Sequence, residues 1–575
     1  MDKNESVKAV PMQEEIARQF RPVIFLLMGA VALVLLIGCA NLANLMLARA
    51  IAAQRALATR LALGATRWRL ARQLLTESLV LAGIGAVIGL LVAYWGVQGV
   101  IYIVSTNIPD FSLNPSEMSI VDWRVLLFTV SVSVVTGALF GMFPAAQLSR
   151  PDLSMVFQSG GRGGTGQARR RTHSILVVAE VGLALVLLIS ATLLIRTIRA
   201  LRAVDPGFDS RNVLIMQTSL AGSTYNTNRA IESLSRRAVE RLESIPGVLR
   251  ASPAVAAPLI GIGLDLPFTI EGKPPGAGDR YNGDEQWRFV GPNYFATLSV
   301  PVRKGRAFTE SDNAAAAKVV IINEAMAKKY WANENPLGRR ITIGHGLGLQ
   351  FEDPPREIVG IVADVREAGF NKPAPPVMYV PMNQMSDALI GFGNSVLPTT
   401  WIVRTASSST GLATTIRREF ASIDSQLAVA NVRPLNEANL NTLANENIST
   451  NLLTVFAAIA LVLASVGIYG LVSHAVQQRT QEIGVRLSLG ATPADVYKLI
   501  LGQAMKLALA GVLLGVAGAI GLTRFLSSVL FGVRPADPPT FVIMSIVLAA
   551  IALLAAYVPA RRAISIKPVV ALREV

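Results

Sequence analysis

Residues 60–66 read Arg60-Leu61-Ala62-Leu63-Gly64-Ala65-Thr66, and this heptapeptide returns 426 residues later as Arg486-Leu487-Ser488-Leu489-Gly490-Ala491-Thr492. The match extends beyond the heptapeptide, because Gly85 corresponds to Gly511 and Gly89 to Gly515 at the same shift. Farther along the chain, Asp122 corresponds to Asp537 at a shift of 415 residues. Two copies of one unit therefore flank a long central segment, and this internal repeat decides the architecture.

Each heptapeptide ends in a threonine that suits the N-cap of a helix. The hydroxyl of Thr66 or Thr492 is positioned to accept a backbone N–H that has no partner inside the helix. In the second copy, Pro493 and Asp495 follow at the first and third helical positions, a typical helix start. A surface turn with a good cap would explain one copy. Two copies beside matching apolar runs favour a short helix at a membrane edge that leads into a long apolar helix.

The composition indicates a membrane protein. Of the 575 residues, 52% are hydrophobic and only 16% are charged, and the mean hydropathy is +0.46. Soluble globular chains carry roughly 25% charged residues. The net charge of +15 comes largely from basic residues beside apolar runs, so membrane topology explains it and no nucleic acid is expected. One cysteine and three dispersed histidines provide neither a disulfide framework nor a cluster of metal ligands.

Seven apolar runs are long enough to be membrane spans. We therefore predict a polytopic α-helical membrane protein with about seven spans, arranged 3+1+3, around a mixed α+β domain. Glu180 is the one charged residue inside the fourth run. The runs cover residues 22–48, 78–109, 125–149, 174–195, 452–478, 507–523 and 538–560.

The charges of the loops orient these spans. The loop after the first span is rich in arginine, the next loop is acidic, and the third is basic again. Basic loops stay in the cytoplasm. This rule puts the N-terminus and the central domain outside the cytoplasm, and the C-terminus and both heptapeptides inside it. The expected domains are an extracytoplasmic remnant at 1–21, a three-span unit at 22–149, a basic Gly-rich cytoplasmic linker at 150–173, an anchoring helix at 174–196, the extracytoplasmic domain at 197–450 and a second three-span unit at 451–575.

The central segment reads as a mixed α+β domain. Strands are expected at 212–216, 319–322 and 358–362, and helices at 228–242 and 410–422. No catalytic constellation, cofactor site or metal site is visible in this segment. The chain also lacks the Gly-x-x-x-x-Gly-Lys-Ser/Thr phosphate loop, so ATP-driven work requires another polypeptide and no enzymatic activity is expected of this one.

Several motifs identify a family when they are taken in order. Before the second heptapeptide stands Gln481-Glu482-Ile483-Gly484-Val485, and the central segment carries Gly291-Pro292-Asn293-Tyr294-Phe295, Gly305-Arg306-Ala307-Phe308-Thr309-Glu310-Ser311-Asp312, Asn323-Glu324-Ala325 with Tyr330-Trp331, Pro336-Leu337-Gly338-Arg339-Arg340 and Ile358-Val359-Gly360-Ile361-Val362-Ala363-Asp364-Val365. With these motifs the chain resembles FtsX-like and MacB-like ABC transporter permeases of the duplicated orphan-permease (ADOP) type. The central segment resembles the MacB-like periplasmic core domain. Relative to that type, the chain is expected to be an incomplete reading frame, without the N-terminal span and the first extracytoplasmic domain.

The resemblance implies a permease in the bacterial plasma (inner) membrane. Its partners would be the lipid bilayer and a separate MacB/LolD-like ATPase subunit, with a periplasmic adaptor and a homodimeric assembly as further suggestions. The permease would pass nucleotide-driven movements to the extracytoplasmic domain, for export or mechanotransmission. The alternative is an FtsX-like regulatory scaffold that transmits force to a cell-wall hydrolase. A membrane-tethered enzyme is disfavoured because no catalytic motif is present.

The ATPase-coupling residues follow from the repeated, capped element on the basic side of the membrane. In the first copy they are Arg60, Gly64, Thr66, Arg67 and Arg69, and in the second Glu482, Arg486, Gly490, Thr492 and Asp495. Glu482 corresponds to Ala56, so the two copies would be unequal if that acid contacts a partner.

Two further predictions concern the membrane spans. The small-x-x-x-small pairs Gly85/Gly89 and Gly511/Gly515 are expected to permit close helix packing. Glu180 leaves two alternatives open. It lies either buried against a neighbouring helix or near the cytoplasmic headgroups beside His173 and the basic residues 169–171, where it would be partly solvated.

Overall fold

The structure is a computed structural model that describes residues 21–44, 66–107, 123–148, 165–221, 225–260, 264–345, 348, 351–367, 369–407, 411–437, 444–527 and 529–564. The chain divides into two compact units, which are treated separately below. The first unit comprises residues 1–200 and 445–575, and the second comprises residues 201–444.

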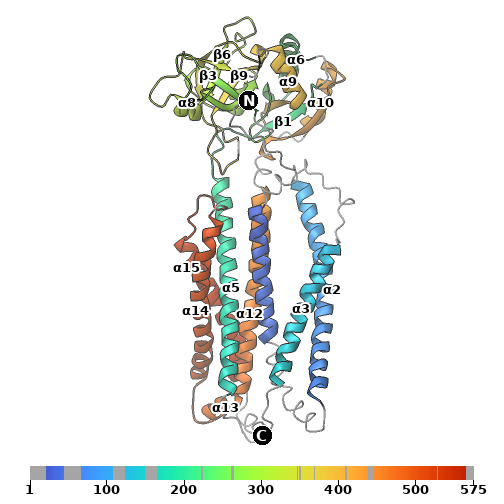
Figure 1. Ribbon diagram of the computed structural model, residues 1–575, viewed down its shortest axis with the longest axis vertical. Helices are drawn as coiled ribbons and strands as arrows, with labels where there is room; N and C mark the ends of the chain where they lie inside the picture. Colours follow the sequence, from blue (N-terminus) through green and yellow to red (C-terminus); the bar gives the residue numbers. More distant parts are fainter. Residues whose placement is uncertain are drawn as a thin grey trace. The chain divides into compact units, whose positions relative to one another are not determined.

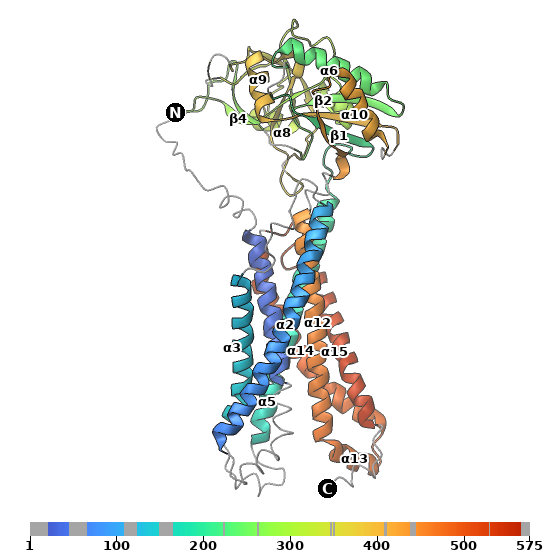
Figure 2. The ribbon, with the colours of Figure 1, turned by 90° about the vertical axis from the view of Figure 1, so that its right-hand side faces the viewer.

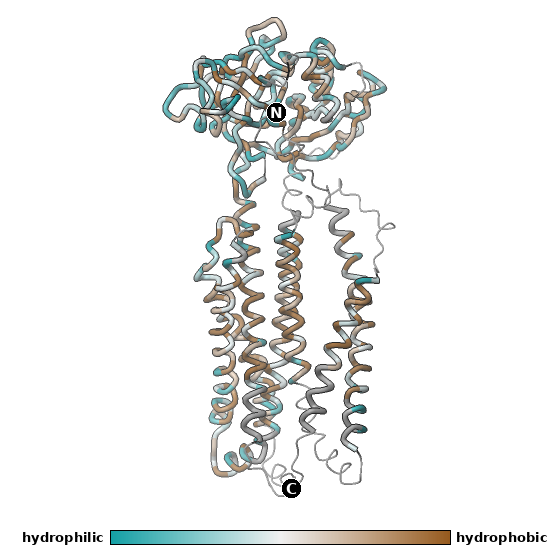
Figure 3. The backbone as a smooth tube through the Cα atoms, viewed as in Figure 1, coloured by the Kyte–Doolittle hydropathy of each residue, from teal (hydrophilic) through white to brown (hydrophobic). Residues whose placement is uncertain are grey.

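The first unit is a set of long apolar helices, which confirms the predicted polytopic α-helical class (Figures 1 and 3). Among the described residues, six helices are long and apolar enough to cross a membrane. The seventh expected span is helix α3 (Trp123–Leu148), whose apolar stretch 123–138 falls below the length of the other six. The six are Arg21–Asn44, here called the first span, α2 (Arg67–Asn107), α5 (Thr165–Arg202), α12 (Ala444–Gln478), α14 (Pro493–Leu526) and α15 (Pro538–Ile564).

One expected boundary was wrong. Residues 165–173, predicted to belong to a flexible linker, form the first turns of α5. Basic residues and glycines favour a linker locally, but the apolar run that follows propagates a helix back through them. The remaining part of the expected linker, residues 150–164, lies outside the described residues.

The second unit is the expected mixed α+β domain, built on one sheet of eleven strands. The predicted strands at 212–216, 319–322 and 358–362 are β1, β6 and β8, and the predicted helices are α6 and α10. The strands are β1 (Val213–Thr218), β2 (Val248–Ala254), β3 (Leu264–Ile270), β4 (Gly283–Val290), β5 (Val302–Gly305), β6 (Val319–Asn323), β7 (Arg340–Ile343), β8 (Arg356–Val362), β9 (Val377–Pro381), β10 (Thr399–Thr405) and β11 (Val429–Pro434). The helices are α6 (Asn228–Glu243), α7 (Tyr294–Leu298), α8 (Glu324–Tyr330), η1 (Met382–Gln384), α9 (Asp387–Val396) and α10 (Leu412–Ile423).

The sheet has two parts that meet at β2 and β4. Strands β11, β1, β10 and β2 form an antiparallel sheet, and α6 and α10 contribute Leu234 and Phe420 to the core cluster that also holds Trp401 of β10. Strands β4, β3, β7, β8, β6 and β9 follow, and the parallel pairing of β9 with β4 closes these six strands into a ring. Figure 2 shows this unit with α6 and α10 along the antiparallel part.

A buried ionic network fixes the ring where β8 begins. The Arg356 side chain is fully buried, and its guanidinium donates to Asp353 (2.5 Å), to the backbone carbonyl of Gln384 (2.9 Å) and to the Gln384 side chain (3.1 Å). The Gln384 amide in turn accepts from the backbone N–H of Val319 at the start of β6 (3.0 Å). One arginine therefore ties together β8, β6 and the turn after β9.

Candidate functional site

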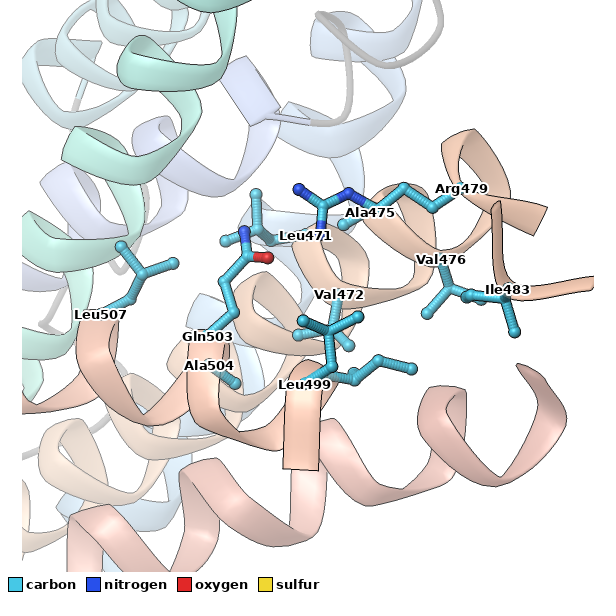
Figure 4. Close-up of a pocket in the computed structure, with 11 residues that line it drawn as sticks. Leu471, Val472, Ala475, Val476, Arg479, Ile483, Leu499, Gln503, Ala504 and Leu507 are labelled. Carbon is cyan, nitrogen blue, oxygen red and sulfur yellow. The ribbon is translucent and has the colours of Figure 1, made fainter. Parts of the chain in front are cut away.

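Helix α13 (Thr480–Ser488) contains Glu482 and Arg486 of the second coupling element and joins the span α12 to the span α14 (Figure 1). Its inner face carries Ile483, which is 4% exposed and packs with Val476 of α12 and Val496 of α14. Figure 4 shows the side chains of Val476 and Ile483 directed toward each other beside a cavity of about 30 Å³. Through Ile483, α13 therefore packs against both spans.

The end of α13 explains the glycine of the heptapeptide. Gly490 has a φ of +95°, a backbone conformation that favours glycine. The N–H of Ala491 donates to the carbonyl of Arg486 (2.9 Å), the bond of a Schellman C-cap. Helix α14 then starts at Pro493, and the Asp495 carboxylate accepts from the backbone N–H (3.0 Å) and the hydroxyl (2.7 Å) of Thr492. The heptapeptide thus encodes a helix stop, a tight turn and a helix start.

The outer face of α13 combines apolar and charged side chains. Leu489 is 82% exposed and Val485 is 42% exposed. Beside them, Arg486 donates to Glu482 (2.6 Å), and Arg479 lies 3.9 Å from the same carboxylate. Sequence reasoning selected the charged residues and missed Leu489, although its position next to the capping glycine could have indicated a surface site. We call Glu482, Val485, Arg486 and Leu489 the α13 face.

The first coupling element is described only from Thr66 onward. Helix α2 begins at Arg67, directly after Thr66, and the N–H of Arg69 donates to the Thr66 carbonyl (3.1 Å). Arg60 and Gly64 lie outside the described residues, so the structure does not test the equivalence of the two elements.

A second group of predicted residues lies inside the helix bundle. Glu180 of α5 is fully buried, so the buried alternative describes its position. The amide of Asn41 on the first span donates to Glu180 Oε1 (2.5 Å) and to the backbone carbonyl of Leu463 on α12 (2.8 Å). Gly467 of α12 leaves room for this contact, because a Cβ there would overlap the Glu180 carboxyl. The carboxyl of α5 therefore lies at a junction with one span from each repeat unit.

Further polar side chains lie about two helical turns from Glu180 along the same helices. His173 Nδ1 of α5 lies 3.1 Å from Asn44 Oδ1 of the first span, and its ring centroid is 6.1 Å from that of His474 on α12. In a lipid environment these side chains can find polar partners only inside the protein. Buried Asn41, Asn44, His173 and Glu180 thus form a polar cluster with the half-buried His474 between the first span, α5 and α12. No group of three or more metal-ligating side chains occurs among the described residues.

The two glycine pairs differ in their surroundings. Gly511 and Gly515 are buried against α5, where an added Cβ would lie 2.6 Å from Val181 Cβ and 2.8 Å from the Gly182 carbonyl oxygen, respectively. At Gly85 and Gly89 an added Cβ would meet nothing within 4 Å, contrary to the expected close packing. The physical reason is that α5 packs on Gly511 and Gly515, whereas none of the described helices packs on Gly85 and Gly89 in this way.

The central domain contains one large polar cleft, with a volume of about 1080 Å³. Burial raises the pKa of Asp364 in this cleft, partly offset by a hydrogen bond from the N–H of Ala325 (2.7 Å). The lining combines acidic and basic side chains. Its charged residues are Asp205, Asp209, Glu324, Asp364, Arg211, Arg303, Lys328, Lys329 and Arg366.

Two family models match most of the chain. The model described as FtsX-like permease C-terminal matches residues 28–153 and again 454–568, which are the two repeat units. The model described as MacB-like periplasmic core domain matches residues 174–419.

The curated relatives are bacterial export proteins and a permease. The chain is 28% identical over 305 residues to the pyoverdine export ATP-binding/permease protein PvdT of Pseudomonas aeruginosa, covering 51% of this chain and 43% of that protein. It is 26% identical over 234 residues to the macrolide export ATP-binding/permease protein MacB of Aggregatibacter actinomycetemcomitans, covering 40% and 34%. The ABC transporter permease YknZ of Bacillus subtilis is 27% identical over 242 residues, covering 42% and 57%. The matches thus span 34–57% of the length of these relatives.

Two solved structures of domains of related transporters resemble part of the chain. The periplasmic region of MacB from Actinobacillus actinomycetemcomitans shares 16% identity, covers 41% of this chain and 94% of that one, and has a TM-score of 0.27. The extracellular domain of the transporter YknZ shares 18% identity over 38% of this chain and 99% of that one, with a TM-score of 0.25.

Proposed function

Because this chain belongs to the FtsX-like permeases that carry a MacB-like periplasmic core domain, we propose that it is the membrane subunit of an ABC transporter for export. A separate cytoplasmic ATPase binds it and supplies the energy. The movement passes through the spans to the extracytoplasmic domain. The relatives named for export of pyoverdine and macrolides support export over the regulatory alternative, in which the chain acts on a cell-wall hydrolase.

The α13 face is the observation that carries this proposal. An exposed leucine and valine beside an arginine–glutamate pair resemble the centre and rim of a protein interface, where buried apolar anchors are surrounded by polar groups. The helix that bears them is packed on α12 and α14 through Ile483. A subunit that binds the α13 face therefore acts on two membrane spans at once, as ATP-driven transmission requires.

Replacing Leu489 with alanine should weaken binding of the ATPase roughly ten-fold to hundred-fold. Full burial of a leucine is worth about 1.5–3 kcal/mol, and each 1.4 kcal/mol is about ten-fold in affinity. The measurement is titration of the ATPase that co-purifies with the wild-type chain onto chains in nanodiscs, with stimulated ATP hydrolysis as a second readout.

Leu513→Ala is the matched control, because Leu513 is 65% exposed on α14 within a membrane span. It should leave both readouts unchanged. Equal affinity for wild type and Leu489→Ala would refute docking on the α13 face, and a wild-type chain that retains no ATPase would refute the transporter assignment.

The proposed topology puts the central domain outside the cytoplasm and the α13 face inside it, because the loops on the α13 side are basic. In a Cys39→Ala background, Glu271→Cys in an exposed loop of the domain should react with an impermeant maleimide in cells whose outer membrane, if present, is opened. Leu489→Cys should react only after the inner membrane is lysed. The reverse pattern, in chains that are shown to be folded, would contradict the orientation.

A further inference from the structure

Tyrosine and arginine side chains from three spans meet where α14 begins and α15 ends. The rings of Tyr497 on α14 and Tyr557 on α15 are stacked, with centroids 5.7 Å apart and planes tilted by 7°. About one turn farther along α15, Arg562 donates to the hydroxyl of Tyr469 on α12 (3.0 Å). Figures 1 and 2 show α14 and α15 side by side. We call Tyr469, Tyr497, Tyr557, Arg561 and Arg562 the tyrosine–arginine patch.

The outer face of α15 changes from apolar to cationic within two turns of its end. Leu554 is 67% exposed, and Tyr557 and Val558 are each 45% exposed. Arg561 and Arg562 follow one turn later, at the spacing that puts them on the same helix face, and both are exposed. In a membrane, such a face offers apolar side chains to the acyl chains, tyrosine to the boundary and guanidinium groups to the headgroups.

The charge around the patch is positive. The only carboxylate in α14 and α15 is Asp495, and it accepts from the backbone N–H (3.0 Å) and the hydroxyl (2.7 Å) of Thr492. Lys498 is exposed next to Tyr497 and adds a further cation at this end of the helices. The patch therefore suits a ligand that carries negative charge.

A ligand at this place must also lie against hydrocarbon. The patch continues directly into the apolar face of α15, so a ligand that covers both needs a negative head and an apolar tail. Guanidinium groups bind phosphate oxygens through a planar fork of N–H donors. An anionic phospholipid meets all three requirements. A zwitterionic lipid carries its own cation, which offsets the attraction between its phosphate and the arginines.

We propose that the tyrosine–arginine patch binds the headgroup phosphate of an anionic phospholipid, with phosphatidylglycerol as the test case. Arg561 and Arg562 contact the phosphate, and the bond to Tyr469 fixes the direction in which the Arg562 guanidinium points. One acyl chain follows the exposed face of α15 past Leu554. Because the patch takes side chains from α12, α14 and α15, the bound lipid joins the ends of three spans.

The experiment uses the full chain with Val558→Trp as a reporter, in phosphatidylcholine nanodiscs. Phosphatidylglycerol or phosphatidylcholine with brominated acyl chains is titrated in, because bromine quenches a tryptophan that it contacts. The parent chain, with its six tryptophans, gives the background. Each cation near a membrane surface strengthens the binding of anionic lipid about five-fold. The relative binding constant at the reporter should therefore favour phosphatidylglycerol by about five-fold to thirty-fold.

Matched variants separate a site from general attraction. Arg561→Gln with Arg562→Gln should bring the relative binding constant close to one, whereas Arg561→Lys with Arg562→Lys should keep most of the preference, because ammonium groups also attract phosphate. Arg69→Gln with Arg72→Gln removes two exposed arginines from the start of α2 and should change nothing at the reporter. Circular dichroism should be the same for all variants.

A second reporter tests the position of the site. Val542→Trp lies near the other end of α15, where Val542 is 57% exposed, and it should be quenched equally by both brominated lipids. Inorganic phosphate added to the buffer should not displace the lipid from the Val558→Trp reporter, because free phosphate lacks the acyl chains.

Three results would overturn the proposal. The first is equal quenching of the Val558→Trp reporter by the two lipids. The second is an equal loss of preference in the Arg69→Gln, Arg72→Gln chain, which indicates a general attraction to basic protein. The third is displacement by inorganic phosphate, which makes free phosphate the ligand. The assay involves no ATPase, so its outcome is independent of the proposed function.

Discussion

Replacing Glu180 with lysine should prevent the helix bundle from assembling. The carboxyl is fully buried at the junction of the first span, α5 and α12, and it accepts a hydrogen bond from Asn41 (2.5 Å). Lysine cannot accept that bond, and a charged residue within a span is costly, by up to about 2.5–3.5 kcal/mol at a helix centre on insertion scales. We expect the variant to lose its monodisperse peak in detergent gel filtration and its stimulation of the ATPase.

Glu180→Gln is the conservative control, because its amide oxygen can still accept from Asn41, and it should assemble normally. A second pair of variants tests the geometry without changing charge. Gly467→Val should disrupt assembly, since its side chain would overlap Glu180, whereas Gly470→Val on the same helix meets nothing within 4 Å and should not. Normal insertion, stability and activity of Glu180→Lys would favour the position near the headgroups instead.

Replacing Arg356 with methionine should lower the free energy of unfolding of the 201–444 domain by about 3–5 kcal/mol. The methionine fills similar space, but it leaves the Asp353 carboxylate buried without its cation and removes the bonds to Gln384. Removing one partner of a buried pair costs more than the pair contributes, because the other charge stays desolvated. Urea unfolding of the domain, expressed by itself, measures the change.

The double variant Arg356→Met with Asp353→Leu should recover most of that loss, because no buried charge remains unpaired. Arg236→Met breaks an exposed pair with Glu232 (3.1 Å) and should change the stability by less than about 1 kcal/mol. A loss below about 1 kcal/mol for Arg356→Met would mean that water reaches the site and that the network does not hold the ring.

The sequence correctly predicted those features of the fold that depend on a local pattern of residues. Apolar runs gave the spans, short β-rich runs gave β1, β6 and β8, and the Gly490–Thr492 turn gave the break between α13 and α14. Hydrophobic length, side-chain period and capping are properties of a few neighbouring residues, so they can be read without knowing the rest of the fold. The start of α5 at Thr165 was missed because helix propagation from a long span overrode a local linker composition.

The sequence by itself determined that this chain is a duplicated set of membrane spans around a MacB-like domain, because repeats and hydropathy survive in the linear order of residues. Only the tertiary structure decided that Glu180 meets Asn41, which is 139 residues away, and that Leu489 points away from the bundle. It also decided that Gly511 and Gly515 lie under α5 while Gly85 and Gly89 stand open. Matching local sequences acquired different surroundings because the burial of a residue depends on which helix packs beside it, and that helix lies far away in the sequence.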